Sequence, residues 1–154
     1  KVGLGVGMKV VAYDPFIDAA NIQLDFFDGQ HVNFTIDTVS KEAVLEQADF
    51  ISLHVPAQDN YVIGAPEFSI MKKGAGIVNA ARGGVIDEVA LVAAIDQGII
   101  SNAALDVFEN EPSPEIHLLM NKNISLTPHI GAATKEAQDR IGEELASQII
   151  EILA

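Results

Sequence analysis

The sequence predicts an α/β fold built on a doubly wound parallel sheet, and three observations lead to this class. Short apolar runs of strand length alternate with segments that have helical periodicity or helix-capping residues. Several of these runs end in small or polar residues, which is typical of the edge where an open parallel sheet binds its ligand. The 154 residues, 49% of them hydrophobic, with 12 glycines and 6 prolines, suit one domain with a single core.

A glycine-rich stretch, Gly3-Leu4-Gly5-Val6-Gly7, stands near the start of the chain. A Gly-x-Gly motif that binds a dinucleotide needs a strand before it and a helix after it. Here the motif is followed by the apolar residues 9–13, which predict a strand. We therefore interpret the glycines as a helix end that turns into this strand.

The next part of the chain contains helix and strand signals of unequal strength. Alternating apolar residues suggest a short strand at residues 32–36, within a segment whose pattern is otherwise ambiguous. Ser40 predicts the N-cap of a helix that runs to about residue 47. The apolar run 50–55 predicts a buried strand that Pro56 ends, and residues 65–71 predict a short helix.

The central part predicts a strand, a helix and a second strand in succession. Residues 75–78 form a short apolar run, and Asp87 is a good N-cap for the periodic segment 88–97. Gly98 suits the position after the helix end, and residues 102–108 predict the following strand.

The last part predicts a short strand and a closing helix. Residues 123–127 form the strand, and Thr134 caps the helix. Apolar residues step by four along one face of this helix. They are Ala137, Ile141, Leu145 and Ile149. Because no repeat, linker or low-complexity segment interrupts the chain, we interpret it as one domain.

The composition excludes several classes of partner. A net charge of -13 argues against nucleic acids and anionic membrane surfaces. No apolar run approaches the roughly 20 residues of a membrane helix, and no signal peptide is visible. Cysteine is absent, which excludes disulfides and thiolate metal sites and suits a reducing compartment, so we expect a cytoplasmic protein.

Three side chains of complementary chemistry, Arg82, Glu111 and His129, follow three different predicted strands. Because the carboxyl ends of parallel strands meet at one sheet edge, we expect them to share a cleft. The guanidinium can hold a substrate carboxylate with two parallel hydrogen bonds. The imidazole can take up and return a hydroxyl proton, and the carboxylate can fix its tautomer and favour its protonated form. This set predicts hydride transfer between a 2-hydroxy acid and a cofactor.

Each of the three residues also has a structural interpretation. Arg82 alone could be a surface ion-pairing residue, Glu111 a solvated turn acid, and His129 a cap on the last strand. The prediction therefore depends on the three positions agreeing. His54 could line a cofactor cleft or be structural, and no spacing of histidines and carboxylates suggests a metal site.

Asp14 ends the predicted strand 9–13 and precedes Pro15. An acid at the end of the second strand of a dinucleotide fold binds the adenosine ribose and favours NAD over NADP. This acid normally lies about 20 residues after the glycine-rich loop, which places the loop and the first strand ahead of Lys1. The alternative is a turn-forming aspartate before proline.

Three motifs carry a resemblance to a known family. They are Asn79-Ala80-Ala81-Arg82-Gly83-Gly84-Val85-Ile86-Asp87, Leu105-Asp106-Val107-Phe108-Glu109-Asn110-Glu111-Pro112 and Leu126-Thr127-Pro128-His129-Ile130-Gly131-Ala132. In order and spacing they resemble the D-isomer-specific 2-hydroxyacid dehydrogenases, and most of all the members that oxidise phosphoglycerate in serine synthesis. The resemblance covers almost the whole chain and implies a Rossmann-like NAD-binding domain in a homodimer or homotetramer.

The resemblance also implies a role for individual residues. Arg82 would bind the substrate carboxylate and contact NAD, His129 would donate and accept the proton, and Glu111 would be its acidic partner. The remaining NAD contacts implied are Asp14 at the ribose, Asp106 at the carboxamide, Val55, Pro56, Ala80 and Ala81 along the cofactor, and His129, Ile130, Gly131 and Ala132 around the nicotinamide end.

The chain departs from the family pattern at its start. The first strand, the Gly-x-Gly-x-x-Gly loop and the substrate domain of the family have no counterpart in residues 1–154, so we expect a truncated domain that is inactive on its own. A non-catalytic NAD(H)-sensing protein, like the related corepressors, is the alternative. A formate dehydrogenase is a weaker one, because its motif carries glutamine where this chain has Glu111.

Overall fold

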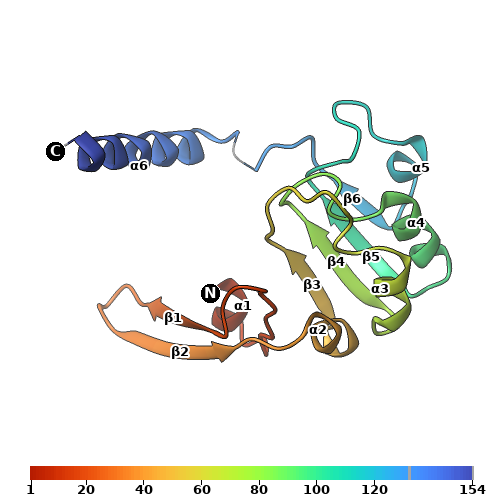
Figure 1. Ribbon diagram of the computed structural model, residues 1–154, viewed down its shortest axis with the longest axis horizontal. Helices are drawn as coiled ribbons and strands as arrows, with labels where there is room; N and C mark the ends of the chain where they lie inside the picture. Colours follow the sequence, from red (N-terminus) through yellow and green to blue (C-terminus); the bar gives the residue numbers. More distant parts are fainter. Residues whose placement is uncertain (132, 154) are drawn as a thin grey trace.

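The centre of the molecule is a four-stranded parallel sheet (Figure 1). The computed structural model describes residues 1–131 and 133–153. The strands pair in the order β3-β4-β5-β6 and are Phe50–Leu53, Ala75–Asn79, Ile100–Leu105 and Ile124–Leu126. Helices connect consecutive strands, which confirms the predicted parallel α/β class.

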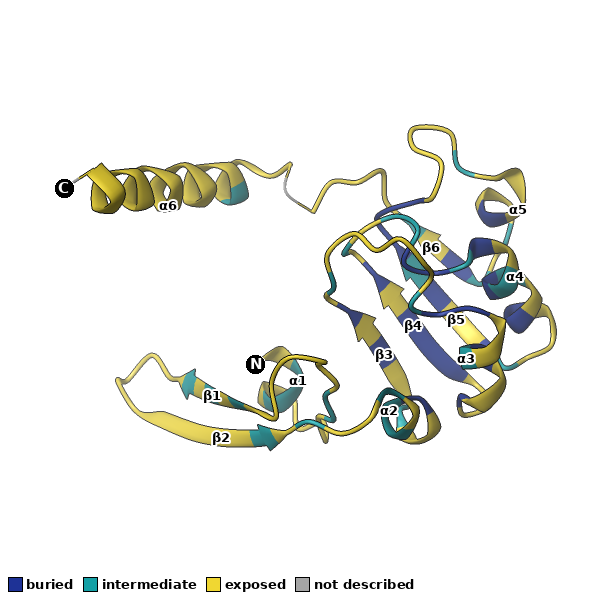
Figure 2. Ribbon diagram, viewed as in Figure 1, coloured by how far each residue is buried: buried dark blue, intermediate teal, exposed yellow. Residues whose placement is uncertain are grey.

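Four helices pack against one face of this sheet and share its core. They are α2 (Lys41–Gln47), α3 (Ala65–Ile70), α4 (Glu88–Asp96) and α5 (Ile116–Leu119). Each contributes a buried apolar side chain to the core cluster that it shares with the strands. Buried positions are dark blue in Figure 2. The side chains that α2, α3, α4 and α5 bury most fully are Leu45, Phe68, Leu91 and Leu118.

The helix caps predicted from the sequence are present. The Ser40 hydroxyl accepts a hydrogen bond from Ala43 N at 3.1 Å, and Asp87 Oδ1 accepts one from Ala90 N at 2.9 Å. Gly98 follows α4 with a φ of 69°, in the left-handed region that glycine adopts without steric cost. These local signals set the helix starts, and through them the loops at the sheet edge.

The second face of the sheet is exposed, whereas a doubly wound sheet carries helices on both faces. Phe50 is 73% exposed and Val78 is 39% exposed on this side. The strand order runs β3 to β6 in one direction, and successive right-handed crossovers in one direction place their helices on the same face. The described residues thus form the half of the doubly wound fold in which helices cover one face of the sheet.

The N-terminal segment lies apart from the sheet (Figure 1). Helix α1 (Val2–Gly5) ends in a turn at Gly7, whose φ is 80°, so the glycine-rich stretch is a helix end as predicted. The predicted strand at residues 9–13 is wrong. Only Ala12 forms a bridge there, to Thr38, because a strand needs a neighbour to complete its hydrogen-bond ladder.

An antiparallel hairpin occupies the segment that the sequence left ambiguous. It consists of β1 (Ala19–Asp25) and β2 (His31–Asp37). The short strand predicted at residues 32–36 is confirmed as part of β2, whereas β1 was not predicted. Phe26 N donates to Gln30 O at 2.8 Å across a turn in which Gly29 has a φ of 82°.

The closing helix α6 (Lys135–Leu153) extends away from the sheet (Figure 1). Its predicted cap is present, since Ala137 N donates to Thr134 Oγ1 at 3.2 Å. Its predicted apolar stripe is exposed, with Ile141 at 56% and Leu145 at 55%. Neither α6 nor another helix within residues 1–131 and 133–153 combines the length and apolar composition that crossing a membrane requires.

Candidate active site

The turn after β4 carries Arg82, and the side chain of Asn79 shapes it. Asn79 is the last residue of β4 and is 3% exposed. Its Nδ2 donates to Arg82 O at 3.0 Å, and its Oδ1 accepts from Ala81 N at 3.1 Å. The amide therefore replaces the backbone partners that the chain loses where the strand ends.

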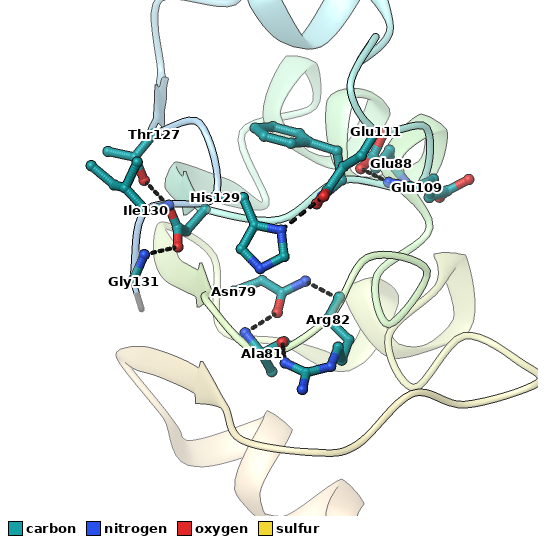
Figure 3. Close-up of polar contacts among 12 residues, drawn as sticks. Asn79, Ala81, Arg82, Glu88, Glu109, Glu111, Thr127, His129, Ile130 and Gly131 are labelled. Carbon is teal, nitrogen blue, oxygen red and sulfur yellow. Dashed lines mark hydrogen bonds and ion pairs between the residues drawn. The ribbon is translucent and has the colours of Figure 1, made fainter. Parts of the chain in front are cut away.

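The guanidinium of Arg82 is exposed at this turn (Figure 3). Its Nη1 donates to Ala81 O at 2.6 Å, so one donor of the five is used by the adjacent backbone. Ala80 is exposed and Ala81 is half-buried, so the two residues that precede Arg82 in this turn have small side chains. A planar group with free donors in this position suits a carboxylate ligand.

Glu111 and His129 form the central contact of the site. Glu111 Oε2 lies 2.8 Å from His129 Nδ1, and Glu111 Oε1 accepts a hydrogen bond from Phe108 N at 3.0 Å (Figure 3). The contact to His129 and then the Phe108 N–H hold the pKa of Glu111 below its ordinary value. An ionised carboxylate only accepts hydrogen bonds, so Nδ1 is the donor and Nε2 remains for a substrate.

The carboxylate of Asp106 holds the turn that carries His129. Oδ1 accepts from Thr127 Oγ1 at 2.6 Å and from Ile130 N at 2.9 Å, and Oδ2 accepts from Gly131 N at 2.9 Å. Burial raises the pKa of Asp106, but these three hydrogen bonds outweigh it and leave the pKa below its ordinary value. The turn places His129 at a φ of 53°, in the left-handed region that non-glycine residues rarely adopt.

Arg82, Glu111 and His129 line one cleft of about 1060 Å³. Its walls come from the turn after β4, the segment after β5, the segment after β6 and the loop before α3, which contributes Tyr61. Arg82 and His129, which are 47 positions apart in the sequence, thus border one space, as expected where the carboxyl ends of parallel strands meet. The cleft can hold an anion beside Arg82. In the same cleft, His129 Nε2 can act as a proton acceptor.

The other residues predicted to contact a cofactor are placed as follows. Val55 is half-buried against the core, and Pro56 is exposed just beyond β3. Asp14 lies in the N-terminal segment, where its Oδ1 accepts from Phe16 N at 2.8 Å. Gly131 is exposed beside Asp106, and Ala132 lies outside the described residues. His54, which could line a cofactor cleft or be structural, is exposed with its Nε2 2.8 Å from Ser52 Oγ.

The residues around the cleft fit the nicotinamide ring of a dinucleotide better than its pyrophosphate. Gly83 and Gly84 border the cleft beside Arg82, which leaves room for a flat ring. The helices that begin at this edge, α3 and α4, are closed by their own acids: Glu67 Oε2 accepts from Gly64 N, and Asp87 caps α4. Their N-termini are therefore not open to a pyrophosphate.

Asn79 is the residue that sequence reasoning missed at this site. An asparagine at a strand end followed by small residues is a signal for a side-chain-stabilised turn, and it could have been recognised. Thr127 was treated as a strand residue, although its hydroxyl bonds Asp106. A contact across 21 positions has no local signal in the sequence.

Fold and cleft together define the class as a Rossmann-like, dinucleotide-binding α/β domain. Residues 1–131 match the family model described as "D-isomer specific 2-hydroxyacid dehydrogenase, NAD binding domain". The chain therefore belongs to the D-isomer-specific 2-hydroxyacid dehydrogenases, as their NAD-binding domain, and NAD is its cofactor.

Three similar proteins illustrate the relationship. The chain is 43% identical to D-3-phosphoglycerate dehydrogenase 2, chloroplastic, of Arabidopsis thaliana, over 94% of this chain and 22% of that protein. It is 43% identical to a hydroxypyruvate reductase of Thermotoga maritima, over 99% of this chain and 48% of that protein. The crystal structure of D-lactate dehydrogenase from Aquifex aeolicus complexed with NAD and lactic acid matches with 30% identity and a TM-score of 0.72, over 99% of this chain and 48% of that one. The chain thus spans half or less of these relatives.

Proposed function

We propose that the whole protein is an NAD-dependent oxidoreductase that interconverts a D-2-hydroxy acid and its 2-keto acid. The observation that carries the proposal is the 2.8 Å contact between His129 Nδ1 and Glu111 Oε2 in the cleft that Arg82 also lines. Family membership supports the same reaction class.

Each of these three residues has one task in the proposed reaction. Arg82 binds the substrate carboxylate and so fixes the carbon that bears the hydroxyl group. His129 Nε2 takes the hydroxyl proton during oxidation and returns it to the keto oxygen during reduction. Glu111 stabilises the imidazolium that forms and keeps Nε2 directed at the substrate. Bound NAD supplies the acceptor for the hydride that leaves the same carbon.

The proposed cofactor contacts come from several segments of the chain. Ala80 and Ala81 would border the nicotinamide end from the β4 side, and Ile130, Gly131 and Ala132 from the β6 side. Asp106 would add a carboxylate contact, and Val55, Pro56 and Asp14 would extend the contacts toward the adenosine ribose.

For the substrate, we propose 3-phosphoglycerate, which the enzyme would oxidise in serine biosynthesis. The support is 43% identity to a protein named D-3-phosphoglycerate dehydrogenase. The equal identity to a protein named hydroxypyruvate reductase makes the unphosphorylated acid the competing substrate. In the described part of the cleft wall, Arg82 is the one arginine or lysine, so groups for a substrate phosphate would come from elsewhere.

We further propose that the first strand, the glycine-rich loop and the substrate domain belong to the whole protein but lie outside residues 1–154. The closed N-termini of α3 and α4 support this, because a pyrophosphate needs free N–H groups. A domain of residues 1–154 alone would then bind NADH far more weakly than the whole protein, which isothermal titration of both would test. Homodimeric or homotetrameric assembly and a cytoplasmic location complete the proposal.

The proposed function is tested by NADH consumption in the whole protein. Phosphohydroxypyruvate, hydroxypyruvate and glyoxylate are supplied separately, and kcat/KM is compared for the three. We expect turnover with all three and the highest kcat/KM with phosphohydroxypyruvate. A higher value with hydroxypyruvate would replace the proposed substrate and keep the reaction. NADH binding without turnover of any keto acid would instead favour the NAD(H)-sensing alternative.

A further inference from the structure

Glu88 and Glu109 exchange a pair of hydrogen bonds beside the site. Glu109 N donates to Glu88 Oε1 at 2.8 Å, and Glu88 N donates to Glu109 Oε1 at 3.0 Å (Figure 3). The pair joins the first residue of α4 to the segment that follows β5. Two residues 21 positions apart are thus held by two reciprocal contacts.

This reciprocal pair is adjacent to the residues that hold Glu111. Phe108 precedes Glu109, and its N–H donates to Glu111 Oε1 at 3.0 Å. The carbonyl of Phe108 contacts the turn of Arg82, since a Cβ added to Gly83 would lie 1.8 Å from Phe108 O. The segment after β5 is therefore fixed to two neighbours: to α4 through Glu88, and to the Arg82 turn through Gly83.

Helix capping does not account for Glu88. Asp87 already caps α4 through its contact to Ala90 N. Glu88 is buried, at 6% exposure, and its Oε2 has no hydrogen-bond partner among the described residues. The carboxylates of Glu109, Glu111 and Glu115 face it and, after burial, raise its pKa further. Burying such a group opposes folding, so what it contributes here is the hydrogen bond to Glu109 N.

We infer that Glu88 is a positioning residue, which through Glu109 fixes the segment that holds Glu111 against His129. The inference rests on the proposed function for its catalytic consequence, whereas its structural part stands on the contacts alone. Glu88 does not line the cleft and does not touch the proposed substrate site. Misplacement of a catalytic group by about 1 Å can lower a rate by about 100-fold, so a clamp of this kind affects turnover.

The test compares three substitutions of Glu88 in the whole protein. Glu88→Gln keeps an oxygen that can accept from Glu109 N. Glu88→Asp keeps the carboxylate but shortens its reach, and Glu88→Met removes the acceptor at similar volume. Glu42→Gln is the matched control, because Glu42 also lies in the first turn of a helix and is exposed.

We expect Glu88→Asp and Glu88→Met to lower kcat by about 10- to 100-fold with little change in NADH affinity. Glu88→Gln should retain kcat within about 3-fold, as expected when the accepting oxygen is kept. A wild-type kcat in Glu88→Asp would overturn the inference, as would equal impairment of Glu88→Gln.

A second measurement does not depend on turnover. The Nδ1 proton of His129, hydrogen-bonded to Glu111, should give a downfield proton resonance in labelled protein. This resonance should shift or disappear in Glu88→Asp and persist in Glu88→Gln and Glu42→Gln. If the wild type turns over no keto acid, the proposed function fails, and the resonance alone decides the positioning inference. An unchanged resonance in Glu88→Asp, which keeps an acid at the helix start and so should fold, would refute the inference.

Discussion

His129 Nδ1 and Glu111 Oε2 lie 2.8 Å apart although neither residue belongs to a helix or a strand. Their separation is set by hydrogen bonds to neighbouring turns: Phe108 N holds Glu111, and Asp106 holds the turn of His129. His129 adopts a left-handed backbone conformation to reach its partner, with a φ of 53°. The geometry of the proposed acid–base pair therefore depends on residues that take no part in the proposed proton transfer.

Replacement of the imidazole tests its proposed role in proton transfer. His129→Asn should lower kcat by about 10²–10⁴-fold and leave NADH affinity nearly unchanged. Asparagine is preferred to alanine for this test, because it tolerates the left-handed conformation that residue 129 adopts. Steady-state rates and NADH titrations of the two proteins measure both quantities. Equal losses of turnover and NADH affinity would identify a structural histidine instead.

Replacement of the guanidinium separates charge from geometry. Arg82→Lys keeps a cation but removes the planar pair of donors, so kcat/KM for the keto acid should fall by about 10- to 100-fold. The melting temperature should stay within about 1 °C of the wild type, because Arg82 is exposed and its guanidinium bonds only the neighbouring carbonyl of Ala81 among the described residues. An unchanged kcat/KM would mean that a point charge at position 82 is enough to bind the substrate carboxylate.

Much of the fold could be predicted because its signals are local. Ser40 and Asp87 are capping residues at helix starts, and short apolar runs mark the four strands of the sheet. The meeting of Glu111 with His129 was also predictable, because the carboxyl ends of parallel strands share an edge. The strand predicted at residues 9–13 is absent because a strand depends on a neighbouring strand, and strand propensity does not say whether one is present.

The contacts that support the site could not be predicted in the same way. Glu88 has the sequence signature of an ordinary acid in a first helical turn, and its bond to Glu109 crosses 21 positions. Gly83 could be recognised as permissive, but its partner, the carbonyl of Phe108, could not. Such contacts depend on how two loops pack, which no pattern within either loop reports.

Adding one methyl group at Gly83 tests the packing of the two loops. Gly83→Ala places a Cβ 1.8 Å from Phe108 O, so the loops must separate. We expect a loss of about 1–3 kcal/mol in the free energy of unfolding, together with reduced turnover. Gly142→Ala in α6 is the matched control, because its added Cβ meets nothing within 4 Å. The control should stabilise by about 0.5–1 kcal/mol if anything, and denaturant unfolding compares the two.

The turn of His129 should lose stability in acid through Asp106. The pKa of Asp106 in the folded protein lies below its ordinary value of 3.8, so the unfolded chain binds the proton more readily. Its contribution is complete above pH 3.8 and is lost as the pH falls through the folded pKa. Asp106→Asn should therefore be less stable than wild type at pH 7, and the difference should shrink below about pH 4. Unfolding curves between pH 3 and pH 7 measure it, and a constant difference would contradict the assignment.

The contribution of Glu88 to stability should depend on pH in the opposite direction to that of Asp106. Burial, followed by the nearby carboxylates, raises the pKa of Glu88 above its ordinary value of 4.5, so the folded protein holds a proton that the unfolded chain releases. Stability from this group is present below pH 4.5 and is lost as the pH rises through the folded pKa. Glu88→Gln does not titrate and keeps an acceptor for Glu109 N, so its stability relative to wild type should increase as the pH rises from about 4 to 7.

Glu88→Gln and Asp106→Asn should change relative stability in opposite directions as the pH rises, Asp106→Asn below about pH 4 and Glu88→Gln above it. A uniform effect of acid on the whole fold cannot produce both trends. Glu42→Gln, at an exposed first-turn glutamate, should show neither trend. If Glu88→Gln followed the same direction as Asp106→Asn, Glu88 would be ionised and stabilised in the folded protein. The unpartnered Oε2 would then need a donor, and the reciprocal pair with Glu109 would no longer describe the surroundings of Glu88 completely.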